Sequence, residues 1–439
     1  MHRKFLTPLF ASFCLGLTLS LTAFGSERSV ELARLAVSKK PGESSSAIAE
    51  LRAKGPAGLK ILFDAYAGEI QRSASGVSSG GPEWQRLTAA LDAVSQQRNS
   101  YASGLYWYTD LAEATAAAKA SSKPILSLRL LGNLSEEFSC ANSRFFRAVL
   151  YANKEVSKYL GEHFILHWKT VRPAPRVTID FGDGRKLERT LTGNSIHYIL
   201  DSKGLPVDAL PGLYGPAAFM RGLAQAETIV NQIAAKTPAQ RSAALRVYHS
   251  ERIQAIARDW ASDVAKSGGK VPADVVARIE RKRTTPGAIQ IAPVAITKSG
   301  IEVDLLRSIT ADATALEAAT DISSWNRIAN LHSTDARLDA GSIAFIKRQN
   351  PTLHANGPLL SQTVKNLEQY LALDTVRNEY MLRTKLHSWF VTGMASPNLE
   401  NLNEQVYAQL FLTPRSDPWL GLYSPDVYTA LDNEGISKN

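Results

Sequence analysis

One cysteine is the residue of this chain whose type and setting best fit covalent chemistry. Cys140 follows the apolar run Ile125–Leu131, which predicts a buried strand, and it directly precedes a segment that predicts a helix. A helix N-terminus lowers the pKa of a thiol, because it stabilises the thiolate. Cys140 could therefore be a nucleophile in disulfide exchange, or, alternatively, a small apolar residue that fills the core.

The N-terminal segment decides how many thiols the mature protein has. The basic start His2–Lys4, the apolar run over residues 5–24 and the small residues Ala23 and Gly25 are typical of a signal peptide cleaved after Gly25. Cleavage would remove Cys14 and leave one cysteine, so no internal disulfide could form. We therefore expect an exported protein, periplasmic or extracellular; the alternative is a segment retained as a membrane anchor.

The composition indicates a chain that buries large cores in more than one domain. It has 439 residues, of which 44% are apolar and 21% are charged. The formal net charge is +9, but the densest basic cluster, Arg281-Lys282-Arg283, is short and contains no aromatic residue, so we expect no nucleic-acid partner. No segment after the leader is apolar for long enough to span a bilayer, so we do not expect an integral membrane protein once the leader is removed.

The pattern of apolar residues divides the rest of the chain into three regions. Residues 26–100 have helical spacing, interrupted by a turn at Gly55-Pro56. Residues 101–226 alternate between strand and helix signals, and residues 227–439 are mostly helical. We therefore expect an α/β domain flanked by mostly α-helical N- and C-terminal regions.

The α/β region has a definite order of predicted elements. An Ala-rich helix capped by Thr109-Asp110 precedes the strand at Ile125–Leu131, and a helical crossover after Cys140 makes the next strand parallel to the first. The remaining predicted elements are the strand 164–168, a hairpin with a glycine turn over residues 177–191, the strand 198–200 and a closing helix over residues 216–224.

This order of elements resembles that of the thioredoxin-like superfamily. The resemblance rests on Lys123-Pro124-Ile125-Leu126, Cys140 at a helix start, Phe164–Trp168, Tyr198–Gly204 and Leu210–Gly212. It implies a thioredoxin-like fold with Cys140 as the catalytic thiol. Where the family has the second cysteine of a Cys-x-x-Cys motif, this chain has Ser143, and a serine cannot resolve a mixed disulfide. The resemblance therefore implies monothiol exchange with protein thiols or disulfides as partners.

The resemblance also assigns two residues opposite Cys140. Counting back from Lys203-Gly204 brings Ile196 to the position of the family's cis-proline. A cis bond before a residue other than proline costs about 3–4 kcal/mol, so we expect a trans peptide there. The same count brings His197 to face the cysteine, where an imidazolium would lower the thiol pKa further. The candidate catalytic residues are thus Cys140, Ser143 and His197.

No pattern in the sequence predicts a metal or another cofactor. His163 and His167 are four residues apart, but a strand would separate them by about 13 Å, which is too far for one ion. Phosphate loops and dinucleotide-binding fingerprints are absent from the sequence. Two polar-aromatic clusters, Arg377–Tyr380 and Thr413–Trp419, could line a binding groove or could hold the C-terminal tail on the helices.

Two functions follow from these observations. The first is disulfide exchange or protein handling in the cell envelope, with Cys140 as the nucleophile. The second is a non-catalytic scaffold or protein-binding module with a degenerate thioredoxin-like domain. The two functions differ in the thiolate character of Cys140. The sequence leaves open whether the protein is an enzyme, and it leaves the oligomeric state open as well.

Overall fold

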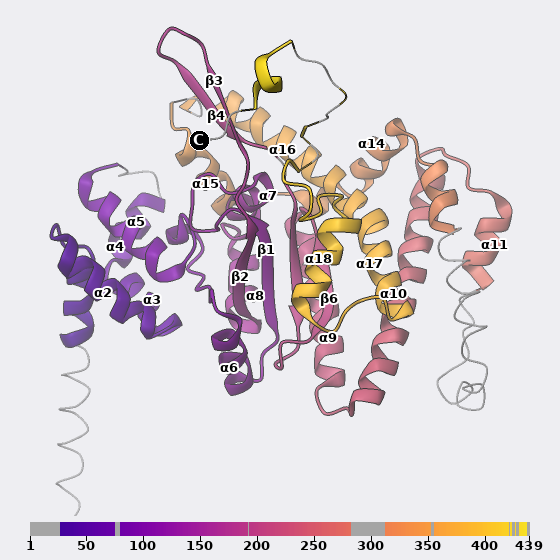
Figure 1. Cartoon of the computed structure of the whole chain (residues 1–439), viewed down its shortest axis with the longest axis horizontal. Helices are drawn as coiled ribbons and strands as arrows, with labels where there is room; N and C mark the ends of the chain where they lie inside the picture. The colour runs from indigo at the N-terminus through magenta and orange to yellow at the C-terminus, as the bar shows by residue number, and fades with distance from the viewer. Residues whose placement is uncertain are drawn as a thin grey trace, which may run out of the picture.

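The computed structural model describes residues 27–74, 80–191, 193–281, 312–352, 355–420, 422–423, 426 and 430–436. Figure 1 shows a group of N-terminal helices on one side, a sheet in the middle and a larger group of C-terminal helices on the other side. This mixed α/β architecture agrees with the class of fold expected from the sequence. The leader expected over residues 1–25 lies outside the described residues.

The N-terminal helices have a hydrophobic core of their own. They include α2 (Pro41–Ala53), α3 (Pro56–Ala65), α4 (Ala67–Ala74) and α5 (Pro82–Ser95). The turn predicted at Gly55-Pro56 lies between α2 and α3. Gly55 has a φ of +65°, which glycine adopts without steric cost, and Pro56 begins α3, where its missing N–H is not needed.

The central sheet has the strand order β2-β1-β5-β6. β1 (Ile125–Leu131) is parallel to β2 (Ile165–Arg172) and antiparallel to β5 (Ser195–Leu200), and β5 is antiparallel to β6 (Pro206–Pro211). β1 has the predicted bounds, and all of its residues are buried because it is a central strand. The predicted parallel pairing of the first two strands is confirmed.

Helices connect and flank these strands. α6 (Leu111–Ser121) precedes β1, and the carboxylate of Asp110 caps it by accepting hydrogen bonds from two backbone N–H groups of its first turn. The crossover from β1 to β2 contains α7 (Ala141–Phe145), a π-helical segment η2 (Phe146–Leu150) and α8 (Lys154–His163). A short 3-10 helix, η1 (Ser100–Ala102), lies between α5 and α6.

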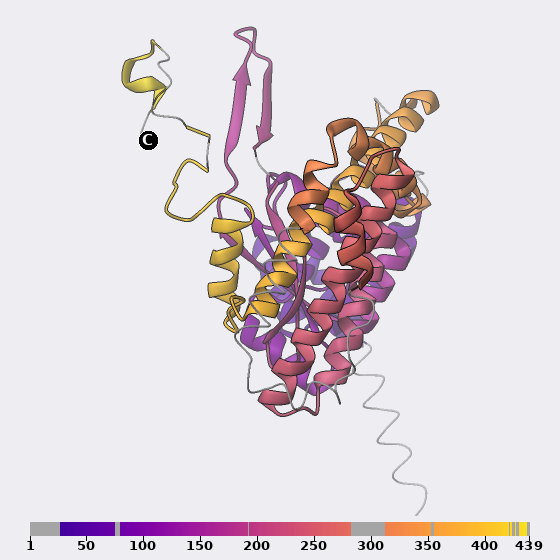
Figure 2. The ribbon, with the colours of Figure 1, turned by 90° about the vertical axis from the view of Figure 1, so that its right-hand side faces the viewer.

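The predicted glycine-turn hairpin forms a separate two-stranded sheet. Its strands are β3 (Arg176–Asp180) and β4 (Lys186–Thr190), and they are antiparallel. Gly182 and Gly184 in the turn both have positive φ. The hairpin projects beyond the main body of the molecule in both views (Figures 1 and 2).

The C-terminal part is built mainly from helices. They are α9 (Pro216–Ile233), α10 (Pro238–Lys266), α11 (Ala273–Arg281), α14 (Ile322–Leu331), η5 (Ser333–Ala336), α15 (Ala340–Gln349), α16 (Gly357–Arg377), the π-helical η7 (Asn378–Arg383), α17 (Thr384–Thr392), α18 (Leu399–Gln409) and η8 (Asp432–Gly435). In the described ranges, no helix is long and apolar enough to cross a membrane. α9 continues through residue 226, where the sequence suggested a domain boundary, and one hydrophobic core joins the sheet to these helices.

Different elements cover the two faces of the sheet. His197 and Tyr198 are adjacent on β5, so their side chains point to opposite faces. The ring of His197 lies 5.0 Å from the ring of Phe219 on α9. The hydroxyl of Tyr198 donates to the side-chain oxygen of Asn403 on α18 at 3.3 Å. The sheet is therefore enclosed between α9 on one face and α18 on the other.

Candidate functional site

Cys140 is the N-cap residue of α7, as the sequence predicted, but its thiol is enclosed. The backbone N–H of Cys140 donates to the carbonyl oxygen of Leu131 at 3.0 Å, which ties the cysteine to the end of β1. The residue has no exposed surface, and its Sγ lies 3.1 Å from the Oγ of Ser195 at the start of β5. A disulfide in solution cannot reach the sulfur unless this part of the fold opens.

A helix from the far end of the chain helps to close this site. Tyr407 on α18 is buried, and its hydroxyl donates to the carbonyl oxygen of Asn194 at 3.0 Å, next to Ser195. The side-chain amide of Asn194 donates to the hydroxyl of Thr413 at 3.1 Å, in the segment that follows α18. Thr413, from the second polar-aromatic cluster, therefore holds the C-terminal segment against the sheet.

Ser143 is close to Cys140 but has a structural partner. Its hydroxyl lies 2.8 Å from the carbonyl oxygen of Cys140 and 2.6 Å from the hydroxyl of Ser139, and the residue is fully buried. A serine side chain commonly makes such local hydrogen bonds to a backbone carbonyl or a neighbouring hydroxyl. The hydroxyl of Ser143 is therefore occupied by contacts within its own segment.

His197 lies in the middle of β5 and is uncharged. Its Nε2 lies 2.7 Å from the hydroxyl of Tyr151, and its ring packs 4.6 Å from that of Phe146. Complete burial lowers its pKa to about 3, so the imidazole is neutral at neutral pH. The expectation of an imidazolium beside Cys140 is therefore corrected by the burial of the ring. The described residues contain no cis peptide bond, in agreement with the trans bond expected at Ile196.

The two histidines at a spacing of four residues have different partners. The Nδ1 of His163 lies 2.9 Å from a carboxylate oxygen of Glu227. The Nδ1 of His167, on β2, lies 2.8 Å from the hydroxyl of Ser127 on β1. The two imidazoles therefore make separate contacts with the protein.

A buried ion network, which no pattern in the sequence predicted, links β6 to the C-terminal helices. Asp208 accepts a hydrogen bond from the hydroxyl of Tyr248 at 2.6 Å and one from Arg383 at 3.0 Å. Arg383 also donates to both carboxylate oxygens of Glu379 at 3.1 Å. Burial alone would raise the pKa of Asp208, but the nearby positive charge of Arg383 holds it well below its usual range. All these charges are compensated within the protein.

Two histidines next to this network form a hydrogen-bonded pair. The Nδ1 atoms of His249 and His387 lie 2.7 Å apart, and the Nδ1 of His387 lies 3.9 Å from the carboxylate of Asp208. Because two nitrogens bound to one tetrahedral zinc ion would be roughly 3.3 Å apart, the shorter distance fits a hydrogen bond better than a metal site. Burial lowers the pKa of His249 to about 4, so one neutral ring donates to the other.

A polar cavity of about 380 Å³ lies beside the ion network, between α9, α10, η5 and η7. Most of its charged side chains are paired with one another. Arg221 donates to both carboxylate oxygens of Asp335 at 2.6 Å, and Arg252 donates to Glu379 at 3.3 Å. The hydrogen bonds of His332 to Asp263 and Asp335 raise the pKa of its imidazole to about 9. Most of the charged side chains that line this cavity are therefore compensated by ion pairs within the protein.

The cluster Arg377–Tyr380 divides between the cavity and the core. Glu379 and Tyr380 line the polar cavity, in line with the groove hypothesis. The guanidinium of Arg377 lies over the ring of Trp325 at 5.7 Å, and the side-chain amide of Asn378 donates to the carbonyl oxygen of Leu213 at 2.7 Å. Half of the cluster therefore has a packing role.

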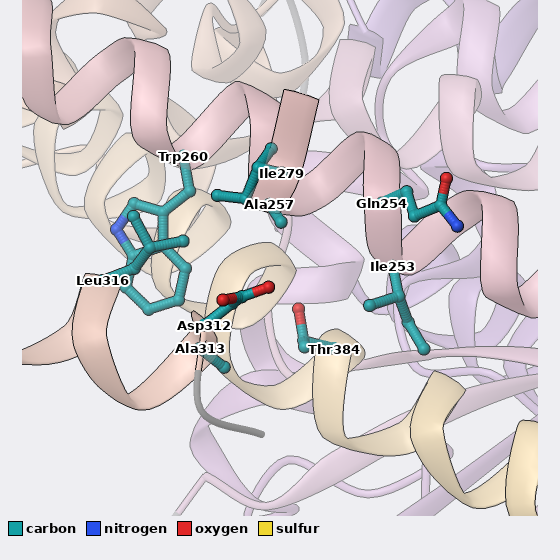
Figure 3. Close-up of a pocket in the computed structure, with 9 residues that line it drawn as sticks. All are labelled: Ile253, Gln254, Ala257, Trp260, Ile279, Asp312, Ala313, Leu316 and Thr384. Carbon is teal, nitrogen blue, oxygen red and sulfur yellow. The ribbon is translucent and has the colours of Figure 1, made fainter. Parts of the chain in front are cut away.

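An apolar pocket lies between α10, α11 and α17 (Figure 3). The side chains of Trp260, Leu316 and Ile253 form its walls, and its volume is about 20 Å³. That volume holds about one water molecule. The pocket is a small packing gap and offers no room for an organic ligand.

Comparisons with known proteins add no family to this description. No family model matches the chain, and no curated protein or solved structure is significantly similar to it.

Proposed function

We propose that this chain is a non-catalytic protein-binding module built around a degenerate thioredoxin-like domain. The order of elements supports the thioredoxin-like part of the proposal. A helix, a central strand, Cys140 at a helix start, a parallel strand, an antiparallel pair and a closing helix follow one another along the chain. The leader predicted from the sequence over residues 1–25 supports an exported setting, periplasmic or extracellular.

The observation that carries the non-catalytic part of the proposal is the enclosure of Cys140. Its thiol has no exposed surface and contacts the hydroxyl of Ser195. Of the other two candidate catalytic residues, Ser143 bonds to the backbone and His197 is neutral. A monothiol mechanism needs an accessible thiolate that attacks a disulfide sulfur. The thiol-exchange function thus requires an opened form of the protein.

The projecting hairpin β3–β4 supports the binding part of the proposal. It exposes two large apolar side chains, Ile179 at 46% and Phe181 at 55% of their surface. A two-stranded hairpin has little stability by itself, and its strands offer unpaired edges to another chain. An exported partner could therefore pack against this hairpin without any covalent step.

The proposal can be tested by capturing partners from an extract of the envelope with the purified chain as bait. We expect wild type and Cys140→Ser to retain the same proteins without a disulfide link. The double variant Ile179→Thr/Phe181→Ser should retain about tenfold less, since loss of a central aromatic anchor typically costs over 1 kcal/mol. Val247→Ser, which changes an equally exposed apolar residue on α10, is the matched control and should bind normally.

The opposite pattern would support thiol exchange. In that case the captured proteins would be joined to the bait by mixed disulfides, would be released by a reducing agent and would be absent with Cys140→Ser. The hairpin variant would then capture as much as wild type. Such a result would overturn the non-catalytic proposal.

A further inference from the structure

Arg129 is a charged residue in a position where strands are normally apolar. It lies in β1, the central strand that pairs with β2 and β5, and only 1% of its side chain is exposed. Lysine and arginine are almost never fully buried without a close counter-charge. The hydrogen-bond and ion-pair partners of this guanidinium therefore indicate whether the fold compensates its charge.

The protein supplies Arg129 with only a partial counter-charge. One terminal nitrogen donates to the hydroxyl of Ser127 at 3.0 Å, and the other donates to Glu400 on α18 at 2.8 Å. Glu400 is 48% exposed and is shared with Lys169, whose ammonium lies 3.2 Å from it. The buried Nε of Arg129 has no hydrogen-bond partner among the residues that the structure describes. One half-exposed carboxylate thus serves two cations.

These residues line a cavity of about 300 Å³ between β1, β2 and α18. Four cations and two carboxylates face it: Arg129, Lys169, Arg172, Arg415, Glu400 and Glu404. Arg172 donates to the carbonyl oxygens of Thr413 and Asp417, at 3.2 and 2.8 Å, so it has no carboxylate among the residues that line the cavity. The cavity therefore carries an excess of positive charge.

These positive charges also affect the pKa of a neighbouring histidine. His167 lies beside Arg129 on the adjacent strand, and its pKa is lowered to about 3. Burial is the main cause, and the positive charges of Arg129 and Lys169 add to it. The Nδ1 of His167 lies 2.8 Å from the hydroxyl of Ser127 and 3.4 Å from a terminal nitrogen of Arg129, so this neutral ring supplies no negative charge to the cations.

We propose that the Arg129 cavity is a binding site for a small ligand that carries an oxyanion, a phosphate or a carboxylate group. The guanidinium of Arg129 forms the floor, and the flexible ammonium of Lys169 closes the rim. Guanidinium groups bind oxyanions through paired N–H donors, and a buried one does so with little competition from water. Glu400 moves into the solvent when the ligand takes its place, because half of its surface is already exposed.

The dimensions of the cavity fit a small molecule. A volume of about 300 Å³ lies at the lower end of the range for ligand sites, and polar neutral groups from Thr170, Asn403 and Thr413 add to its lining. Cys140 does not line the cavity, although Tyr407 and Thr413 lie near both places, and the inference holds whether the thiol is reactive or inert. It therefore goes beyond the proposed function and is tested independently.

Calorimetric titration of the purified chain with inorganic phosphate, at constant ionic strength, tests the site directly. A parallel titration with succinate separates the two sources of the oxyanion, since the tighter of the two identifies the preferred group. We expect saturable binding of at least one of them with one site per chain. Absence of saturable binding by both anions overturns the proposal.

Three substitutions of accessible residues distinguish a built site from general attraction to a basic protein. Lys169→Gln should weaken binding by about three- to tenfold, and Glu400→Gln should strengthen it by a similar factor, because it removes the competing carboxylate. Lys119→Gln on α6 removes the same charge from an exposed position outside the cavity and should have no effect. Equal weakening by Lys169→Gln and Lys119→Gln, or weakening by Glu400→Gln, overturns the proposal.

Discussion

Arg383 and Arg129, two of the buried arginines in the described part of the chain, differ in how their charge is compensated. Arg383 contacts two carboxylates, Asp208 at 3.0 Å and Glu379 at 3.1 Å. Among the described residues, Arg129 forms an ion pair with one carboxylate, that of Glu400, which is half exposed. Burial lowers the pKa of both guanidinium groups, but the two carboxylates raise that of Arg383 well above its usual value, whereas that of Arg129 stays below it.

This difference suggests a structural role for the charge of Arg383 and a ligand-binding role for that of Arg129. The charges around Arg383 balance one another, so the network can fix β6 against α10 and η7 without any ligand. The charge of Arg129 is balanced only in part. Binding of a ligand with a negatively charged group should therefore be favourable there. The same residue type at the same depth thus has two roles, set by its neighbours.

The largest effect on the free energy of unfolding should come from breaking the balanced ion network around Arg383. Arg383→Met leaves the carboxylate of Asp208 buried without its main counter-charge, and we expect a loss of about 3–5 kcal/mol in the free energy of unfolding. The double variant Asp208→Asn/Arg383→Met should recover most of this loss, because it removes both charges. Urea denaturation of the two variants measures the difference. Equal stability of the single and double variants would contradict the role of charge balance.

Raising the pH should have a smaller effect on the free energy of unfolding, through His332 at the rim of the polar cavity. Folding raises the pKa of His332 from 6.5 to about 9, through Asp263 and Asp335. Its stabilisation is therefore fully present below about pH 6.5 and is lost as the pH rises through about 9. The imidazole is partly exposed, so we expect only about 1–2 kcal/mol. His332→Gln should flatten the dependence of the unfolding free energy on pH between 6.5 and 9.5.

The smallest effect on the free energy of unfolding should come from removing the partly balanced charge of Arg129. Arg129→Met keeps most of the side-chain volume and relieves a costly desolvation, so the free energy of unfolding without ligand should change by about 1 kcal/mol or less. The partner left behind, Glu400, is half exposed and can be hydrated. Thermal or urea denaturation in an anion-free buffer makes this measurement. A loss comparable with that of Arg383→Met would remove the distinction between the two regions.

Local elements of the α/β region were predictable because their signals are local. The apolar run Ile125–Leu131 gave the bounds of β1, and the carboxylate of Asp110 caps α6 as expected. The end of α9 was predicted too early, at residue 224. The helix continues to Ile233, because Ala226, Ile229 and Val230 follow at helical spacing and pack in the core.

The sites depend on contacts that no local pattern contains. Asp208, His249 and Arg383 come from β6, α10 and η7, and only tertiary packing brings them together. The sequence contains one signal for these sites: Arg129 and Asp208 are each the single charged residue within an otherwise apolar strand. Cys140 was predicted at a helix start, but its exposure depends partly on α18, which lies far along the chain.

The rate at which Cys140 reacts with iodoacetamide in the native chain, followed by intact mass, tests the non-catalytic proposal most directly. Because the thiol is enclosed, we expect native alkylation at least about a thousandfold slower than alkylation in denaturant, limited by opening of the fold. A native rate within about tenfold of the denatured rate, with an apparent pKa below about 7, would show a reactive thiolate and contradict the proposal.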